Sequence, residues 1–224
     1  MKKRVIKIIL LLIMIISLIN IFIWFYENNK TKEITTKAKK YINIDNNIIS
    51  PKIKNINEDI IGWLIVDNTN INYPVVQGKN NEFYLNHDLD KKYNSAGWIF
   101  MDSNNNLDDQ NIIIYGHHRR DGSMFGSIDN LLNKNKGGKI NLIIKNKKNI
   151  YNIFSIYKTE KNYNYREKNY SNLYKKTAEF KKRSIINYNV DITSKNQIIT
   201  LSTCDNDNKN RIVIHGIKIR KFLD

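Results

Sequence analysis

The chain has 224 residues, of which 41% are hydrophobic and 11% aromatic, enough to build a folded core and to exclude global disorder. Its formal net charge of +16 raises the question of a nucleic-acid partner. The lysines are scattered along the chain rather than gathered in a stripe, and we find no nucleic-acid-binding motif. We therefore expect a basic surface that faces an anionic cell envelope, and no nucleic acid.

An uncharged run, residues 8–26, follows a basic N-terminus, residues 1–7. A helix of this length measures about 28 Å, close to the roughly 30 Å hydrocarbon core of a bilayer. The cations before the run predict a cytoplasmic N-terminus and an extracytoplasmic remainder. The run leads into WFYENNK, which offers no small-residue cleavage site, so we predict an uncleaved single-pass anchor in the cell membrane rather than a signal peptide.

The segment after the anchor, residues 27–60, is predicted to be a helical stalk. Thr31–Ile42 places Ile34, Ala38, Tyr41 and Ile42 on one helical face. This helix either continues the anchor or packs on the following domain, and Pro51 ends the region.

Residues 61–224 are dominated by short β-like runs separated by turn-rich segments. Eight such runs predict a mainly β fold with added helices, built as a closed or nearly closed eight-stranded barrel. The predicted strands are Trp63–Val66, Ile71–Val76, Trp98–Met101, Asn111–Tyr115, Ile140–Ile144, Ile150–Tyr157, Gln197–Thr203 and Arg211–Ile219.

One long helical segment, Tyr163–Asn189, is predicted between the sixth and seventh strands. Ser171 is a suitable N-cap for it. The residues expected on its apolar face are Tyr170, Leu173, Tyr174, Thr177 and Ala178.

Cys204 is the only cysteine of the chain, so it is either a small buried hydrophobe or a reactive thiol. It ends the strand-like run TLSTC, and the short polar loop DNDNKN leads to Arg211, which opens the next run, RIVIHGI. The loop predicts an antiparallel pair with strands about 4.8 Å apart. Cys204 and Arg211 would then flank the mouth of one hairpin.

His117 directly follows another strand-like run, NIIIYG, and so also lies at a strand end. A free thiol is only about 3% ionised at pH 7, and a neighbouring imidazolium would favour the thiolate and could protonate a leaving amine. Arg211 can hold the charge of a carbonyl oxygen under attack. Nucleophile, acid and oxyanion donor together predict an acyl-transfer site, although a His-His pair alone is more often a feature of a surface loop.

No metal or organic cofactor is expected. His117 and His118 are adjacent and project differently, which makes them a poor metal pair. The stretch DSNNNLDD resembles the start of a calcium-binding EF-hand loop, but Leu107 and Ile113 stand where that loop needs Gly and Glu. We interpret His87 and His215 as structural residues.

TLSTC followed by an arginine, with YGHH upstream, resembles the sortases, which are membrane-anchored cysteine transpeptidases of Gram-positive bacteria. The block NEDIIGWLIVDNTNINYPVVQGKNNEFYLNHD, the later AGWIFMD and the helix inserted before the cysteine strand resemble class B in particular. The resemblance covers the chain from about residue 58 onward and implies a sortase-type barrel.

The resemblance implies that Cys204 is the nucleophile, His117 the catalytic histidine and Arg211 the catalytic arginine. It further implies cleavage of a C-terminal sorting motif of the LPxTG, PPxTG or NPxTN type after Thr, through a thioester on Cys204. The partners would be surface proteins that carry the motif, and the acceptor a peptidoglycan amine. Substrate contacts implied by the same resemblance are Asn81, Leu85, Tyr115, Ser202 and Asp205.

Two alternatives stay open at this point. A thiol-dependent hydrolase would use the same residues but let water resolve the thioester. An anchored, non-catalytic binding module would keep Cys204 as a core residue, and Cys204→Ala would then lower stability.

Overall fold

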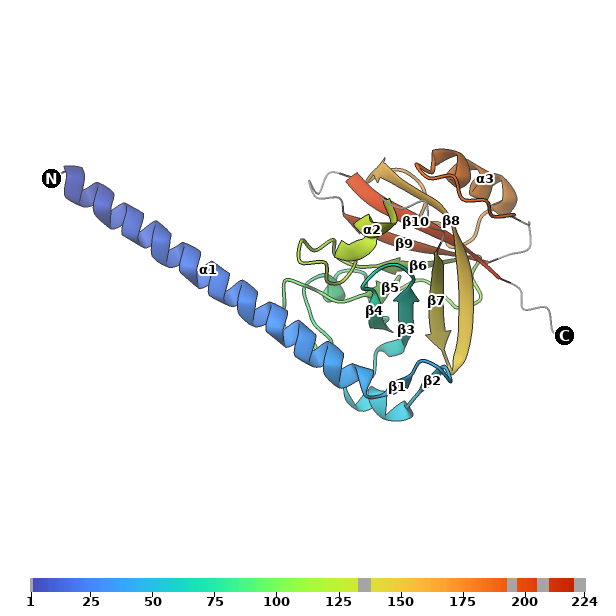
Figure 1. Cartoon of the computed structure of the whole chain (residues 1–224), viewed down its shortest axis with the longest axis horizontal. Coiled ribbons are helices and arrows are strands. Elements are labelled where there is room, and N and C mark those ends of the chain that lie inside the picture. Colours follow the sequence, from blue (N-terminus) through green and yellow to red (C-terminus); the bar gives the residue numbers. More distant parts are fainter. Residues whose placement is uncertain (1, 133–137, 193–196, 205–209, 220–224) are drawn as a thin grey trace.

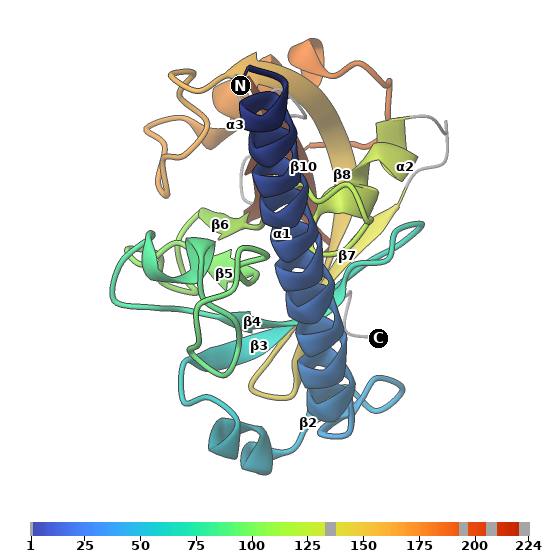
Figure 2. The ribbon, with the colours of Figure 1, turned by 90° about the vertical axis from the view of Figure 1, so that its left-hand side faces the viewer.

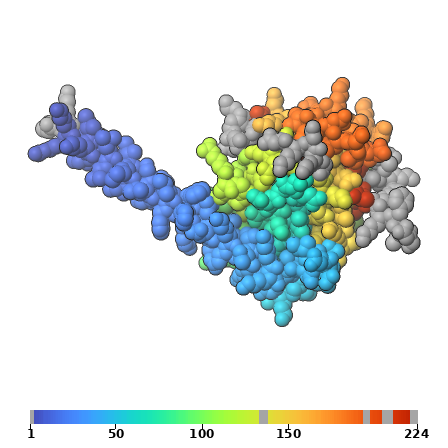
Figure 3. Space-filling view, in the orientation of Figure 1, coloured from blue at the N-terminus to red at the C-terminus, as the bar shows by residue number. Residues whose placement is uncertain are grey.

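The computed structural model describes residues 2–132, 138–192, 197–204 and 210–219. A long N-terminal helix projects from a rounded domain that contains all the other elements (Figure 1). The space-filling view shows the same outline, with the first part of the helix standing clear of the domain (Figure 3).

The N-terminal helix, α1, spans Lys2–Lys39 without interruption and is therefore about 57 Å long. Within the described chain it is the one helix long and apolar enough to cross a membrane. Its first part is exposed, whereas Ile34 and Ala38 are buried against the domain. One continuous helix thus contains both the apolar run and the packed stalk.

The predicted eight-stranded barrel is confirmed. Its strands close in the order β10-β8-β7-β3-β4-β5-β6-β9. Two neighbouring pairs, β4 with β5 and β6 with β9, are parallel, and the other pairs are antiparallel. The barrel strands are β3 (Ile60–Val66), β4 (Asn72–Val76), β5 (Phe100–Met101), β6 (Asn111–Tyr115), β7 (Lys139–Ile144), β8 (Lys147–Glu160), β9 (Ile198–Cys204) and β10 (Asn210–Lys218).

The barrel interior holds the main hydrophobic core, in which Trp63, Leu64 and Ile214 are fully buried. A second, smaller cluster lies under helix α3, where Phe180 and Phe154 are fully buried. Alternation along the strands places apolar side chains inside, which is why the short β-branched runs of the sequence predicted the strands well.

The helix inserted between β8 and β9 is shorter than predicted: α3 spans Leu173–Arg183, within the expected Tyr163–Asn189. Asn172, not Ser171, is its N-cap, because the Asn172 side chain accepts a hydrogen bond from the backbone N–H of Lys175.

The predicted apolar face of this helix is also partly wrong. Tyr174 and Ala178 are exposed, and the buried face consists of Leu173, Thr177 and Phe180. Before the helix the chain is irregular and is held by aromatic side chains, among them Tyr170, whose hydroxyl donates to the backbone oxygen of Tyr165 over 3.0 Å.

The segment between α1 and the barrel also differs from the expected helix, because α1 ends at Lys39 rather than Ile42. A small hairpin follows, made of β1 (Ile42–Asn43) and β2 (Ile48–Ile49). A 3-10 helix then spans Pro51–Asn55 and starts at the proline. Shorter helices occur at Phe83–Leu85, Gly126–Ile128 and, as α2, Asp129–Leu132.

Candidate active site

Cys204 and Arg211 are direct partners across the antiparallel pair of β9 and β10. Opposite residues in such a pair have Cβ atoms about 4.5–5.5 Å apart. The described part of the chain includes the backbone of Cys204 but not its side chain, and Asp205 lies outside the described residues. The predicted hairpin with its two flanking residues is therefore present at the level of the backbone.

The strand that leads to His117 lies on the other side of β9. β6 pairs with β9 in parallel, and Tyr115 is the partner of Ser202. His117 follows Tyr115 by two residues, just as Cys204 follows Ser202, so parallel pairing brings both to the same end of the barrel. Segments almost 90 residues apart in sequence meet there.

A pocket of about 200 Å³ occupies this end of the barrel. Six of the eight side chains predicted from the sequence line it: Asn81, Leu85, Tyr115, His117, Ser202 and Arg211. The remaining lining residues are Phe100, Gly116, Tyr165, Arg166 and Thr203.

The imidazole of His117 is fixed by the backbone. Its Nε2 atom lies 2.6 Å from the carbonyl oxygen of Leu85. Because a carbonyl oxygen can only accept, Nε2 carries a proton in both charge states of the ring. Nδ1 is then the nitrogen left to release or take up a proton, which is the arrangement a general acid and base requires.

Gly97 makes this arrangement sterically feasible. Its φ of +57° is in the left-handed region, and a Cβ built on it would lie 2.6 Å from the Leu85 oxygen and 2.9 Å from Cδ2 of His117. The backbone of the Gly97 turn therefore packs directly against both partners of the hydrogen bond.

The Asp102 carboxylate holds two side chains that line one wall of the pocket. Its Oδ2 atom accepts a hydrogen bond from the Asn81 amide and another from the Tyr115 hydroxyl, each over 2.9 Å. Burial, together with the nearby Asp102 carboxylate, raises the pKa of Tyr115, so its hydroxyl stays protonated and donates. Sequence analysis gave Asp102 no role, although it ends the stretch AGWIFMD and begins the rejected calcium-loop pattern.

The opposite wall is supplied by the irregular segment before α3. The hydroxyls of Tyr165 and Ser202 are 2.8 Å apart, and both groups line the pocket. Arg166, the next residue, also lines the pocket, as Arg211 does. Sequence reasoning missed Tyr165 and Arg166; the signal present was their place in the insert, which was expected to be helical.

The described lining thus combines two guanidinium groups and one imidazole and includes no carboxylate. A positive environment of this kind favours a thiolate over a thiol and stabilises negative charge on an oxygen. In the described chain, no cluster of three His, Cys, Asp or Glu residues is arranged to hold a metal ion.

The other three histidines lie outside this pocket. His118 turns its Nε2 atom toward Asp129 Oδ2, 3.0 Å away. His87 stacks on Phe83 with ring centroids 4.0 Å apart. His215 is fully buried beneath α3, where its ring stacks on Phe180, so the structural interpretation of His215 is confirmed.

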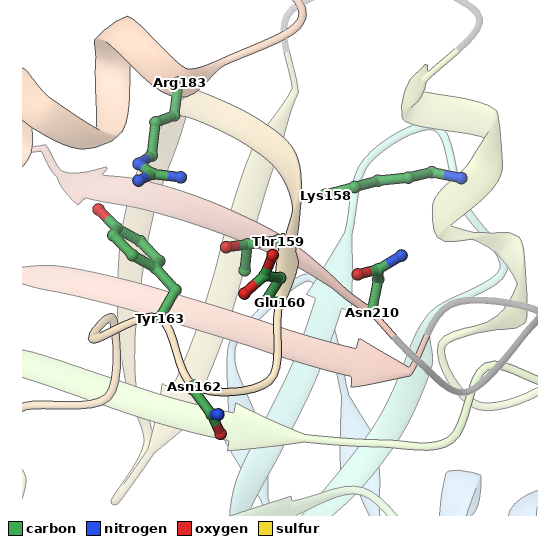
Figure 4. Close-up of a pocket in the computed structure, with 7 residues that line it drawn as sticks. All are labelled: Lys158, Thr159, Glu160, Asn162, Tyr163, Arg183 and Asn210. Atoms are coloured by element: carbon green, nitrogen blue, oxygen red, sulfur yellow. The ribbon is translucent and has the colours of Figure 1, made fainter.

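A larger hollow of about 570 Å³ lies on the β8 side of β10, whereas Cys204 is on the β9 side. Figure 4 shows Arg183 and Tyr163 pointing toward each other at one end of it, with Lys158 and Asn210 at the other. The guanidinium of Arg183 lies 3.8 Å from the centre of the Tyr163 ring. The residues that line it include no thiol and no imidazole, so the smaller pocket is the candidate active site.

Comparison with known proteins agrees with this geometry. Residues 64–219 match the sortase domain family. Sortase B of Staphylococcus aureus is 38% identical over 173 residues, which cover 72% of this chain and 71% of that protein.

Two solved structures extend the similarity to the fold. A crystal structure of sortase B complexed with triglycine aligns with a TM-score of 0.77 and 32% identity, covering 88% of this chain and 98% of the other. The Staphylococcus aureus sortase B–substrate complex aligns with a TM-score of 0.70 and 33% identity, covering 88% and 95%. The chain belongs to the sortase family and is a class B-like cysteine transpeptidase.

Proposed function

We propose that this transpeptidase cleaves a C-terminal sorting motif after its Thr residue and transfers the protein to an amine of peptidoglycan. The observation that carries the proposal is the convergence of His117 and Arg211 in one pocket at the strand end where Cys204 pairs with Arg211. The relatives supply the substrate class, since one solved sortase B is a substrate complex and another a complex with triglycine.

In the proposed first step the Cys204 thiolate attacks the carbonyl carbon of the Thr. A carbon–sulfur bond forms, and the carbonyl electron pair moves onto the oxygen, where the Arg211 guanidinium holds the charge. Collapse of this intermediate breaks the carbon–nitrogen bond. The departing amine takes a proton from Nδ1 of His117, and a thioester remains on Cys204.

In the second step an amine of the acceptor attacks the thioester carbon and gives a proton to the now neutral His117. The carbon–sulfur bond breaks, and Cys204 leaves as a thiolate. The Leu85 carbonyl supports both steps, because it holds Nε2–H and leaves Nδ1 to exchange the proton.

We propose that Asn81, Leu85, Tyr115 and Ser202 contact the sorting peptide, since all four line the pocket. Asp205, which directly follows the nucleophile in the chain, is proposed as a further contact. The motif of the peptide is of the LPxTG, PPxTG or NPxTN type.

We also propose that α1 anchors the enzyme in the cell membrane, with residues 1–7 in the cytoplasm and the barrel outside. The supporting observations are the exposed apolar run of α1 and the cations before it. The surface proteins that carry the sorting signal would then reach the enzyme at the outer face of the membrane.

The test is a digest of fluorogenic LPxTG, PPxTG and NPxTN peptides by the residue 27–224 fragment, with and without triglycine. We expect cleavage of one motif class and a ligated product when triglycine is present. If triglycine changed neither the products nor the rate, water would be the acceptor and the enzyme a hydrolase toward these peptides. Cys204→Ala is the inactive control.

A further inference from the structure

The apolar run of α1 continues into the domain contact without a linker. Tyr26, the last residue of the run, is 64% exposed, whereas Glu27 and Asn28 are only 8% and 9% exposed. Polar side chains are therefore buried against the domain directly after the residue at which the apolar run ends.

Side chains from two loops of the domain contact this part of α1. The Asn94 amide donates to the Glu27 carbonyl oxygen over 3.4 Å and to the Thr31 hydroxyl over 3.2 Å. The Ser95 hydroxyl donates to the Glu27 carboxylate. From the loop after β6, the Arg119 guanidinium donates to the side-chain oxygen of Asn28.

The helical rise gives the depth of these contacts. At 1.5 Å per residue, Glu27, Asn28 and Thr31 lie about 1.5, 3 and 7.5 Å beyond Tyr26 along the axis. The headgroup layer of a bilayer is about 5–7 Å thick on each side. If Tyr26 ends the membrane span, the side chains that contact Glu27 and Asn28 lie at the depth of the lipid headgroups.

The exposed residues of the same two loops have the chemistry of a membrane interface. Tyr93 is 70% exposed. Lys92, beside Tyr93, and Arg120, beside Arg119, are also exposed. Tyrosine is enriched at the headgroup level of membrane proteins, and Lys and Arg there are attracted by anionic lipids. Figure 2, which faces the side of the domain from which α1 projects, shows the loops between β4 and α2 on that side.

We propose that Lys92, Tyr93 and Arg120, exposed residues of these two loops, form a headgroup-facing surface that contacts anionic lipids of the membrane crossed by α1. The inference rests on the proposed anchoring. His117 precedes Arg119 by two residues, so this surface would hold the histidine of the pocket close to the membrane. The enzyme would then act at a fixed height above the bilayer instead of swinging on a flexible tether.

The test uses the full chain, reconstituted in vesicles that contain phosphatidylglycerol, with Cys204→Ala to remove the native thiol. Three variants each carry one new cysteine for a fluorescent label: Tyr93→Cys, Ile48→Cys and Ile15→Cys. Ile48 is 49% exposed, and its hairpin lies at the C-terminal end of α1, away from the apolar run (Figure 1). It is therefore the matched exposed control. Ile15 lies inside the apolar run and reports the anchor itself.

Lipids with a spin label on the headgroup are expected to quench the dye at residue 93 several-fold more than the dye at residue 48. Lipids labelled on the acyl chain should quench the dye at residue 15. Equal quenching of the dyes at residues 93 and 48, with the dye at residue 15 still quenched, would overturn the proposal of a headgroup-facing surface. It would not contradict the anchoring by α1. An unquenched dye at residue 15 would overturn both.

A second comparison tests the preference for anionic lipid. Lys92→Glu combined with Arg120→Glu should reduce the quenching at residue 93 in vesicles with phosphatidylglycerol, and the same reduction is expected when vesicles of phosphatidylcholine alone replace them. If neither the two substitutions nor the change of lipid altered the quenching at residue 93, the anionic-lipid part of the proposal would be overturned. Circular dichroism of each labelled variant checks that the domain is folded.

Discussion

His117 Nε2 lies 2.6 Å from the backbone oxygen of Leu85, and the turn at Gly97 packs against both groups. A methyl group at position 97 would approach the Leu85 oxygen to 2.6 Å, closer than atoms in van der Waals contact, so either the loop or the imidazole must shift. The position of the His117 ring therefore depends on a residue that is not among those lining the pocket.

The first prediction follows from this contact. Gly97→Ala should lower kcat by about 100-fold, since a displacement of about 1 Å in a catalytic group has an effect of that size. Gly122→Ala is the matched control, because Gly122 also has a positive φ, +77°, but the nearest atom to its added Cβ would be 3.7 Å away. Peptide cleavage gives kcat for both variants, and thermal unfolding checks that both are folded. Equal kcat values in two folded variants would contradict the positioning role.

A second prediction separates the two adjacent histidines. His117→Ala should reduce kcat/KM by about 10²–10⁴-fold, the usual contribution of a general acid or base. His118→Ala should keep most of the activity, because its ring points to Asp129 rather than into the pocket. The measurement is steady-state cleavage of the same sorting peptide. If both variants lost activity equally while folded, the assignment of His117 alone would be wrong.

The third prediction concerns the oxyanion. Arg211→Lys should lower kcat by about 10²–10³-fold, because a single ammonium cannot reproduce the planar fork that holds the developing charge. Arg166→Lys is the control, since Arg166 lines the same pocket but lies outside the Cys204 hairpin. Single-turnover formation of the thioester, followed by mass spectrometry, is the direct measurement. A normal rate of acylation by Arg211→Lys would exclude the proposed role.

A fourth prediction concerns substrate binding. Asp102→Asn keeps the size of the side chain but removes the charge that accepts from Asn81 and Tyr115. The KM for the peptide should rise by about 10-fold, in line with the loss of hydrogen bonds to a charged group, while kcat changes little. Asp129→Asn, on the outer side of His118, is the control. A fall in kcat with an unchanged KM would show that Asp102 acts on the chemistry instead.

The barrel and the strand ends at its rim could be predicted because their signal is local, whereas Asn81, Leu85, Tyr115 and Ser202 were expected only from the resemblance to the sortases. Strands such as Asn111–Tyr115 alternate or run as β-branched stretches, and the residues at their ends follow from strand pairing. Cys204, Arg211 and His117 lie at such ends, so the sequence was enough to place them at one rim.

The rest of the pocket could not be predicted because tertiary packing decides it. Tyr165 reaches the pocket from an irregular segment held by aromatic contacts, for which periodicity predicted a helix. Asp102 becomes important only when the fold brings Asn81 and Tyr115 to it. The N-cap of α3 is Asn172 rather than the neighbouring Ser171. Serine and asparagine are both good N-caps, so local propensity could not choose between these two positions.

The final prediction concerns stability and pH. His215 is fully buried, lies 2.9 Å from both the Tyr157 hydroxyl and the Thr200 hydroxyl, and stacks on Phe180. Burial, with a smaller effect of Lys176, lowers the pKa of His215 to about 3, well below the usual value of 6.5. The folded protein therefore keeps this ring neutral where the unfolded chain has already protonated it.

Between pH 6.5 and about 3 the unfolded state binds the additional proton, so stability rises with pH and is lost as the pH falls. From pH 7 to pH 5 this residue should lower the free energy of unfolding by about 2 kcal/mol. His215→Gln keeps polar atoms for both hydroxyls but cannot titrate, so its stability should fall about 2 kcal/mol less over the same interval, whatever its stability at pH 7. Urea unfolding of the residue 27–224 fragment at pH 5, 6 and 7 measures the difference. Parallel curves for the two proteins would show that His215 is protonated in the folded state, contrary to its buried, aromatic surroundings.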